Sequence, residues 1–283
     1  MKKRTEILMC PGDLQYPEGY GKINEWMDER HSVGSFMVKW VYRKVIKLVS
    51  FFGADIKLIP FQKEYPDMFF VRNAGLILPG EKRRVILSSF KHKERQGERD
   101  FYRKWFEENG FEVIDLPVGV IFEGGGEAIW YKNTLFFGHG FRAPINTTNH
   151  IRYALYKANL EANVVPLKLN DERFYHLDTA FMPIYGDGET TEDVLVYAPI
   201  AFDIEALKTI AALSIKRIEV SEEDACVFGC NFLAIGNNII MAKGTKNLAY
   251  KLQNFYGFNV YEVDMAEIKK GGGSVYCMTL NIS

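Results

Sequence analysis

Gly271-Gly272-Gly273-Ser274-Val275-Tyr276-Cys277-Met278-Thr279-Leu280 is the stretch around which the chain is organised. Its three glycines predict a turn, because glycine adopts backbone conformations and permits close approaches that other residues resist. The apolar, β-branched sequence that follows predicts a strand with Cys277 inside it. A buried cysteine usually acts as a small hydrophobe, whereas a thiol beside a glycine turn can also be aimed into a cavity. The rest of the chain must decide between these two interpretations.

The composition excludes several classes of function. The chain has 283 residues, of which 47% are apolar, so it can bury a large core as one large domain or two small ones. Its formal net charge is −1, which argues against a nucleic-acid partner, since such proteins need a basic surplus. No apolar run is long enough for a signal peptide or a membrane span. We therefore expect a cytoplasmic protein with no membrane partner.

Four cysteines, at positions 10, 226, 230 and 277, are too few for a disulfide framework in a chain of this length. Cys226 and Cys230 are four residues apart, but no nearby Cys/His pair completes a zinc-binding pattern. We therefore predict no structural metal.

One order of elements recurs along the chain: a helix, a residue that ends it, a short apolar strand, a polar loop and a hairpin. Helices are predicted over 32–52 and 97–109. The strands that follow helices are predicted at 55–60, 111–117, 163–169, 217–220 and 258–264. The hairpins are predicted at 69–78 with 84–90, 127–132 with 134–138, 180–185 with 193–198, and 231–235 with 239–242.

A repeat of about fifty residues is typical of solenoids, propellers and arrays. Five ββαβ units predict a five-bladed α/β propeller that occupies residues 1–283 as a single domain. The alternative is an ordinary mixed α/β sheet.

A ring of this kind places equivalent segments around its central axis. The repeat assigns to this position residues 66–73, 122–127, 174–179, 224–226 and 271–277. These segments carry a thiol, an imidazole and several carboxylates, so residues far apart in the sequence are expected to converge there.

Cys277 needs a partner that favours the reactive thiolate, and a histidine with a charged neighbour is the usual means. His176 lies two residues before Asp178, a spacing that puts both side chains on one face of a strand. The alternative is a structural hydrogen bond between these two residues at the end of a sheet.

Carboxylates around the thiol indicate the charge of its reaction partner. Glu123 and Glu127 flank three glycines, a turn that lets the backbone crowd a ligand. A planar guanidinium or amidinium pairs bidentately with carboxylates, whereas a peptide or ester would favour oxyanion donors. The sequence therefore favours a cationic electrophile, with a tight turn and solvated acids as the alternative.

Five segments resemble motifs of the amidinotransferase and arginine deiminase-like superfamily, in that superfamily's order. The motif I-N-P-W-M is matched by Ile23-Asn24-Glu25-Trp26-Met27, and P-D-x-x-F-x-x-N-A-G by Pro66-Asp67-Met68-Phe69-Phe70-Val71-Arg72-Asn73-Ala74-Gly75. The motif F-E-G-x-G-D is similar to Phe122-Glu123-Gly124-Gly125-Gly126-Glu127, H-L-D-T to His176-Leu177-Asp178-Thr179, and G-G-S-x-x-C to Gly272-Gly273-Ser274-Val275-Tyr276-Cys277. The matches span nearly the whole chain.

The resemblance implies the pentein fold, a five-bladed α/β propeller, and hydrolysis of a guanidino substrate through a cysteine. Asn73, where arginine deiminases and dimethylarginine hydrolases carry aspartate, resembles the arginine dihydrolase branch, which yields ornithine, ammonia and CO₂. Three departures bear on the substrate: Glu127 replaces an aspartate, Glu25 replaces a proline, and Val71-Arg72 replaces a small Thr-Ala pair.

The resemblance also implies residue roles. Cys277 would attack the guanidino carbon, His176 would act as general acid and base, and Glu123 and Asp178 would hold the nitrogens. The remaining candidates for substrate binding are Asn24, Asn73, Glu127, Arg95 and Arg142, the two arginines as ligands of a substrate carboxylate. This chemistry requires no metal and no organic cofactor.

Other functions stay open at this stage. The same chemistry serves arginine deiminases, dimethylarginine dimethylaminohydrolases and amidinotransferases, which pass the amidino group to an amine instead of water. A different class is a non-catalytic binding protein with the pentein ring, which the combination of Cys277, His176, Asp178 and Glu123 disfavours. The sequence leaves the oligomeric state open, a homo-oligomer included.

Overall fold

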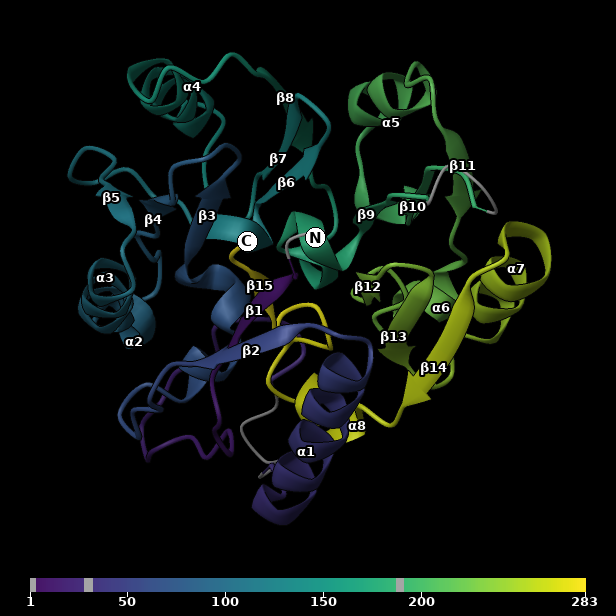
Figure 1. Cartoon of the computed structure of the whole chain (residues 1–283), viewed down its shortest axis with the longest axis horizontal. Helices are drawn as coiled ribbons and strands as arrows, with labels where there is room; N and C mark the ends of the chain where they lie inside the picture. The colour runs from purple at the N-terminus through teal and green to yellow at the C-terminus, as the bar shows by residue number, and fades with distance from the viewer. Residues whose placement is uncertain (1–3, 28–32, 187–190) are drawn as a thin grey trace.

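The computed structural model describes residues 4–27, 33–186 and 191–283. Within these residues the strands form five three-stranded sheets, arranged around a central axis as a ring (Figure 1). In every sheet the middle strand pairs antiparallel with one neighbour and parallel with the other. The chain is therefore a five-bladed α/β propeller of the pentein type, as the repeat predicts.

Four blades are continuous in the sequence. They contain β3 (Gly75–Leu78), β4 (Arg84–Leu87) and β5 (Glu112–Ile114); β6 (Ala128–Tyr131), β7 (Thr134–His139) and β8 (Asn163–Lys168); β9 (Phe181–Ile184), β10 (Val194–Tyr197) and β11 (Lys216–Glu219); and β12 (Leu233–Ile235), β13 (Asn238–Ala242) and β14 (Asn259–Val263). The predicted hairpins and post-helix strands coincide with these elements to within a few residues, except at 69–74.

The fifth blade joins distant parts of the chain. β1 (Glu6–Met9) lies between β15 (Leu280–Asn281) and β2 (Asp55–Leu58). Leu8 is paired with Leu280 in the antiparallel ladder, and Ile7 with Ile56 in the parallel ladder. The segment that carries Cys277 is thus followed directly by a strand that closes the ring.

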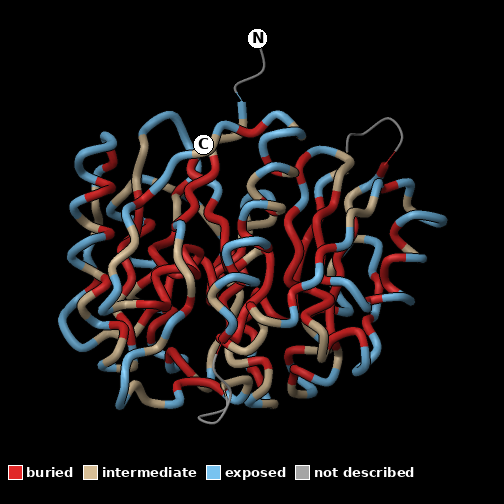
Figure 2. Tube along the Cα trace, turned by 90° about the horizontal axis from the view of Figure 1, so that it is seen from below, coloured by how far each residue is buried: buried red, intermediate tan, exposed pale blue. Residues whose placement is uncertain are grey.

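The helices that connect parallel strands lie on the outside of the ring (Figure 1). They are α1 (Ser35–Phe51), α3 (Glu98–Glu108), α4 (Thr147–Lys157), α5 (Ile204–Ala211) and α7 (Lys246–Tyr256), and the short α2 (Lys93–Gln96) precedes α3. The short α6 (Glu222–Ala225) and α8 (Ala266–Lys269) lie in connections from one blade to the next. In α1, Val38, Val41, Val45 and Val49 are buried, the spacing of one helix face that packs on a sheet. Figure 2 shows the buried residues concentrated between this outer layer and the axis. The predicted start of the first helix at residue 32 lies outside the described residues.

Two predicted strands near the axis are wrong. Residues 69–78 do not form one strand, because Pro66–Phe69 and Val71–Ala74 are 3₁₀-helices, η1 and η2, that precede β3. Cys277 lies in a turn, and β15 begins only at Leu280. The Asn231 side-chain oxygen accepts hydrogen bonds from the backbone N–H groups of Tyr276 and Cys277, so these donors are not available to a strand partner.

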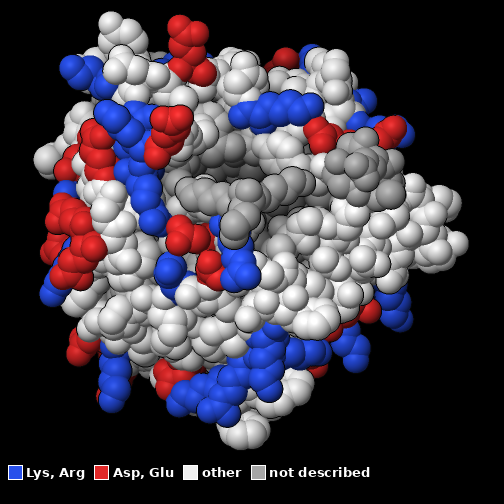
Figure 3. All heavy atoms as spheres, in the orientation of Figure 1, with Lys and Arg blue, Asp and Glu red and all other residues white. Residues whose placement is uncertain are grey.

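Basic side chains gather on α1. Lys39, Arg43 and Lys47 of α1 are exposed, and Figure 3 shows Lys and Arg side chains gathered at the edge of the molecule where α1 lies. Among the described residues, no helix combines the length and apolarity needed to cross a bilayer.

Candidate active site

Five loops meet at the axis of the ring. They are η2, η3 (Gly124–Gly126), η5 (Leu177–Thr179), the loop before β12, and the 271–279 turn. The predicted fourth segment, 224–226, is wrong, because Asp224 lies in α6 and accepts a hydrogen bond from Leu248 N–H of α7. Asn231 occupies the corresponding position at the axis.

Cys277 is buried, and its sulfur lies among polar groups. Its Sγ accepts a hydrogen bond from Asn231 Nδ2 at 3.1 Å and lies 3.4 Å from Asp178 Oδ2, to which the thiol donates. Burial, followed by the charge of Asp178, raises the pKa of the Cys277 thiol well above its ordinary value. The thiol is therefore protonated near neutral pH.

Asp178 offers an unused acceptor beside this thiol. Its Oδ1 is buried and has no hydrogen-bond partner among the described residues. Burial raises the pKa of Asp178 to about 7, and Arg72 is the strongest influence that lowers it. A buried carboxylate oxygen without a donor costs free energy, and a cationic N–H group would remove that cost.

His176 and Glu123 form the second pair of the site. His176 Nε2 lies 2.7 Å from Glu123 Oε2, and both side chains are buried. Burial lowers the pKa of His176 to about 4. Burial opposes ionisation of Glu123, but Arg142, followed by His176, holds its pKa well below the ordinary value. His176 is consequently neutral near pH 7 and donates its Nε2 hydrogen to the Glu123 carboxylate.

The predicted arrangement of His176 and Asp178 on one face of a strand is wrong. His176 has extended backbone angles, but Leu177–Thr179 form a 3₁₀ turn. The turn separates the two side chains, so His176 pairs with Glu123 and Asp178 with Cys277. The structural hydrogen bond between His176 and Asp178, which was the alternative, is not among the contacts of these described residues.

Glu127 stabilises the Glu-Gly-Gly-Gly-Glu turn, which carries Glu123. Glu127 Oε2 accepts from Glu123 N–H at 2.6 Å, and its Oε1 accepts from Ala143 N–H at 2.7 Å. Both oxygens of Glu127 are thus used by backbone donors, which places this predicted substrate ligand in a supporting position. A Cβ on Gly126 would lie 2.3 Å from Asn73 Nδ2 and 3.0 Å from His176 Nδ1, so the turn must be bare for these side chains to pack against it.

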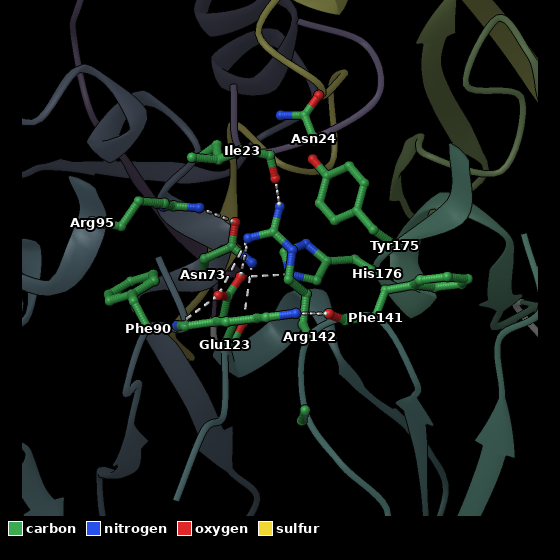
Figure 4. Close-up of polar contacts among 12 residues, drawn as sticks. Ile23, Asn24, Asn73, Phe90, Arg95, Glu123, Phe141, Arg142, Tyr175 and His176 are labelled. Carbon is green, nitrogen blue, oxygen red and sulfur yellow. Dashed lines mark hydrogen bonds and ion pairs between the residues drawn. The ribbon is translucent and has the colours of Figure 1, made fainter. Parts of the chain in front are cut away.

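Asn73 and Arg95 are buried, and hydrogen bonds connect them to Glu123. Asn73 Nδ2 donates to the Glu123 carbonyl oxygen at 3.0 Å, and its Oδ1 accepts from Arg95 at 3.3 Å. Arg95 makes a bidentate ion pair with Glu98, with both N···O distances 2.8 Å. The guanidinium of Arg95 already has a carboxylate partner, and Figure 4 shows it directed at Asn73.

Arg142 and Asn24 connect the 22–27 segment to the site. Arg142 Nη1 lies 3.4 Å from Glu123 Oε1, its Nη2 donates to the Ile23 carbonyl oxygen, and its guanidinium lies 4.5 Å from the centre of the Tyr175 ring. Asn24 Nδ2 donates to the Gly271 carbonyl oxygen at 3.2 Å. Figure 4 shows Arg142 between Glu123 and Ile23, with Asn24 farther away beyond Tyr175.

Sequence reasoning missed two site residues. Asn231 binds both Cys277 and Asp178, and Asp67 accepts hydrogen bonds from Tyr16 and Tyr20 at 2.9 and 2.7 Å. Asn231 had a detectable signal, because a polar residue also stands just before the first hairpin strand in the neighbouring repeats. Among the described residues no group of three His, Cys, Asp or Glu side chains is arranged to hold a metal ion, and all four cysteines are free thiols.

Comparison with known proteins shows which families and relatives the chain is similar to. Residues 42–283 match the family described as "N,N dimethylarginine dimethylhydrolase, eukaryotic". The bifunctional arginine dihydrolase/ornithine cyclodeaminase ArgZ of Synechocystis sp. is 39% identical over 100% of this chain and 38% of its own length. The chain therefore spans about two fifths of that relative. The N(G),N(G)-dimethylarginine dimethylaminohydrolase of Mycobacterium tuberculosis is 31% identical over 92% of this chain and 80% of that protein.

Solved structures that superpose on this chain come from the same two groups of proteins. The N-terminal domain of ArgZ, covalently bound to a reaction intermediate, superposes with a TM-score of 0.87 at 38% identity, covering 99% of this chain and 98% of that domain. A dimethylarginine dimethylaminohydrolase adduct superposes with a TM-score of 0.73 at 19% identity over 99% of this chain and 100% of that chain, which supports the fold alone.

Proposed function

The chain belongs to the N,N-dimethylarginine dimethylhydrolase family, and from this premise we propose that it is a cysteine-dependent hydrolase of a guanidino substrate, most readily arginine. The observation that carries the proposal is the Cys277 thiol beside the unpartnered Asp178 oxygen. A guanidinium placed over the sulfur would supply the missing N–H donor and, with its positive charge, lower the pKa of the thiol. Residues 1–283 would act as one catalytic domain.

Substrate binding would activate the nucleophile. Asp178 and Glu123 would each accept hydrogen bonds from guanidinium nitrogens, which localises the positive charge on the central carbon. The Cys277 thiolate would then attack this carbon and form a tetrahedral adduct. Arg142 would bind a substrate carboxylate only after releasing Glu123 or Ile23, and Arg95 would support Asn73 instead.

His176 would move the protons. The proton that leaves the thiol passes to His176, and His176 delivers it to the departing nitrogen as the C–N bond breaks. A covalent thiouronium then remains on Cys277. Water attacks its carbon while His176 accepts the water proton, and the C–S bond breaks. General acid–base assistance of this kind contributes about 10²–10⁴-fold to the rate.

The identity of the product separates the members of this reaction class. One round on arginine gives citrulline and ammonia, and a second round on citrulline gives ornithine, ammonia and CO₂. The sequence relationship to ArgZ and the amide at Asn73 support the complete dihydrolase reaction. The second candidate is dimethylarginine hydrolysis, which the matched family and the mycobacterial relative favour.

The test is product analysis with purified protein. Arginine, dimethylarginine and other guanidino compounds are incubated separately, and ornithine, citrulline, ammonia and dimethylamine are quantified. We expect ornithine and two equivalents of ammonia from arginine. Folded protein that consumes none of these compounds would contradict the proposal.

The matched control is Cys277→Ser. It should abolish turnover and the mass increase of a trapped covalent intermediate, while its circular dichroism stays that of the wild type. Unchanged turnover in this variant would refute the assignment of the nucleophile. A cytoplasmic location and the oligomeric state stay predictions to be tested separately.

A further inference from the structure

A cavity lies at the edge of the fifth blade, apart from the proposed active site. Its volume is about 730 Å³, which is within the range of small-molecule sites, about 300–1,000 Å³. The described residues that line it come from three segments: residues 11–17, which follow β1, residues 61–63, which follow β2, and the helix α1. Cys277, His176 and Glu123 are not among these lining residues.

The pairing of the fifth blade explains why these segments meet. β1 and β2 are parallel neighbours, so the loops that follow them leave the same edge of the sheet, and α1 connects the two strands. A Cβ added to Gly12 would lie 2.6 Å from two ring carbons of Phe61. The two loops are therefore in direct contact there, and the bare glycine lets the Phe61 ring close one wall of the cavity.

Two tyrosines supply further aromatic walls. Tyr42 of α1 is 8% exposed and belongs to the core under the helix. The Tyr16 hydroxyl donates to Asp67 Oδ1 at 2.9 Å, and a Cβ added to Gly271 would lie 2.7 Å from the Tyr16 oxygen. Packing and hydrogen bonding thus fix these rings together with Phe61, which gives the cavity a preformed apolar surface for a flat ligand.

The same cavity carries an excess of positive charge. Lys39, Arg43 and Lys63 line it and are exposed, and Figure 3 shows basic side chains where α1 lies. Lys39 and Arg43 are one helical turn apart, so they project from the same face of α1. Asp13 is the one carboxylate among the described lining residues, and its Oδ2 lies 3.4 Å from Lys39 Nζ. Asp13 therefore balances Lys39, and Arg43 and Lys63 are left for an anionic ligand.

We propose that this cavity is a binding site for a small organic anion, a flat apolar body that carries a carboxylate or a phosphate. The body lies against Tyr16, Tyr42 and Phe61, and Arg43 and Lys63 bind the acid group. Arginine binds the oxygens of such groups through two parallel hydrogen bonds. The excess positive charge disfavours a guanidinium, so the site serves a molecule other than the proposed substrate.

Three compounds with the same ring system test the charge preference. Naphthyl phosphate, naphthoate and naphthylmethylammonium are titrated separately into the protein, and isothermal titration calorimetry measures binding. We expect the two anions to bind about tenfold or more tightly than the cation, because their charge is complementary to the lining. The tighter of the two anions shows whether a phosphate or a carboxylate is the preferred acid group. Binding of neither anion, or equal binding of the cation, would overturn the proposal.

Substitutions of the two available cations assign the binding to this cavity. Arg43→Gln and Lys63→Gln should each weaken binding of the tighter anion by about tenfold, because each removes a charge-assisted hydrogen bond. The matched control is Lys47→Gln, since Lys47 is also an exposed cation of α1 but does not line the cavity. Its affinity should equal that of the wild type. Equal losses in all three variants would indicate diffuse attraction to a basic surface and would contradict a defined site.

Arg142→Gln separates this cavity from the axis of the ring, where buried arginines also attract anions. Arg142 Nη1 lies 3.4 Å from Glu123 Oε1 in the proposed active site. Once circular dichroism shows that the variant is folded, it should bind the anion as the wild type does. Loss of binding in Arg142→Gln with normal binding in Arg43→Gln would place the ligand at the axis and refute the proposal. Calorimetry needs no turnover, so a chain that hydrolyses no guanidino compound can still confirm this site.

Discussion

At the scale of single residues, the two site carboxylates differ in their readiness to ionise. Glu123 is held ionised by Arg142 and His176, whereas burial raises the pKa of Asp178 to about 7. The Asp178 charge in turn raises the pKa of the Cys277 thiol. A cationic substrate, as proposed above, would reverse this balance, because it would stabilise both Asp178 and the thiolate. Charge on the substrate would then be part of how this site selects it.

The pH dependence of kcat/KM should report Asp178. The free enzyme binds a guanidinium best when Asp178 is ionised, so kcat/KM for arginine should increase as the pH rises through about 7 and level off above it. His176, with its pKa lowered to about 4, stays neutral throughout this range. Steady-state kinetics from about pH 3 to pH 9, at constant ionic strength, measures the profile. An acid limb centred near pH 4 would assign control to His176 instead.

Asp178→Asn should have opposite effects on catalysis and on thiol reactivity. Loss of the carboxylate should lower kcat/KM by about 10²-fold or more, because a buried charge pair with the substrate is lost. The same change should make Cys277 react faster with the neutral alkylating reagent chloroacetamide above about pH 7, where Asp178 of the wild type is ionised, since its charge is the second cause, after burial, of the raised pKa of the thiol. Each unit of decrease in pKa gives about tenfold more thiolate. Slower alkylation would show that Asp178 activates the thiol rather than restrains it.

At the scale of elements, the glycine turn before β6 is packed closely against the backbone of β3. Gly124 has φ +59°, and a Cβ there would lie 2.8 Å from the backbone of Gly75. Gly124→Ala therefore combines backbone strain of about 1–2 kcal/mol with a clash that only movement of β3 can relieve. We expect a loss of stability in thermal unfolding, accompanied by a lower kcat because Glu123 shifts.

Gly53→Ala is the matched control for this prediction. Gly53 has φ +84° but no atom within 4 Å of the added Cβ, and it lies just after α1, outside the site. It should therefore show the strain without the clash, with a smaller decrease in melting temperature and unchanged kcat. Equal decreases in the two variants would mean that the contact with Gly75 carries no cost.

Some of these elements can be predicted from the sequence and others cannot, for physical reasons. The hairpin β6–β7 was predictable because two apolar runs on either side of a two-residue turn are local signals. The loop of Cys277 was not, because its conformation depends on Asn231, which lies 46 residues away in sequence. The pairing of His176 with Glu123 could not be predicted from local sequence either, since the two residues come from different blades and meet only in the folded ring. The roles proposed for Cys277, His176, Glu123 and Asp178 are those that the resemblance to a known superfamily implies.

At the scale of the whole molecule, the ring brings one segment from each blade to the axis. Arg72, Glu123, Asp178, Asn231 and Cys277 each come from a different one of these segments, and hydrogen bonds or charge interactions connect them. The site is thus a property of the closed ring. Any change that opens the ring should affect catalysis as well as stability.

Deleting residues 279–283 tests this dependence at the fifth blade. Leu280 and Ile282 are each 2% exposed, and Ile282 N–H donates to the Glu6 carbonyl oxygen at 2.9 Å. Their loss should cost about 3 kcal/mol or more, since burial of each large apolar side chain contributes about 1.5–3 kcal/mol. It also releases the Cys277 turn from β15. Thermal unfolding and turnover are compared with those of a variant that lacks only the exposed Ser283, which should behave as the full chain does. Because β15 follows the Cys277 turn directly, the longer deletion should abolish turnover even below its cooperative unfolding transition, where the shortened protein is still folded. Normal turnover there would show that four blades suffice to hold the site.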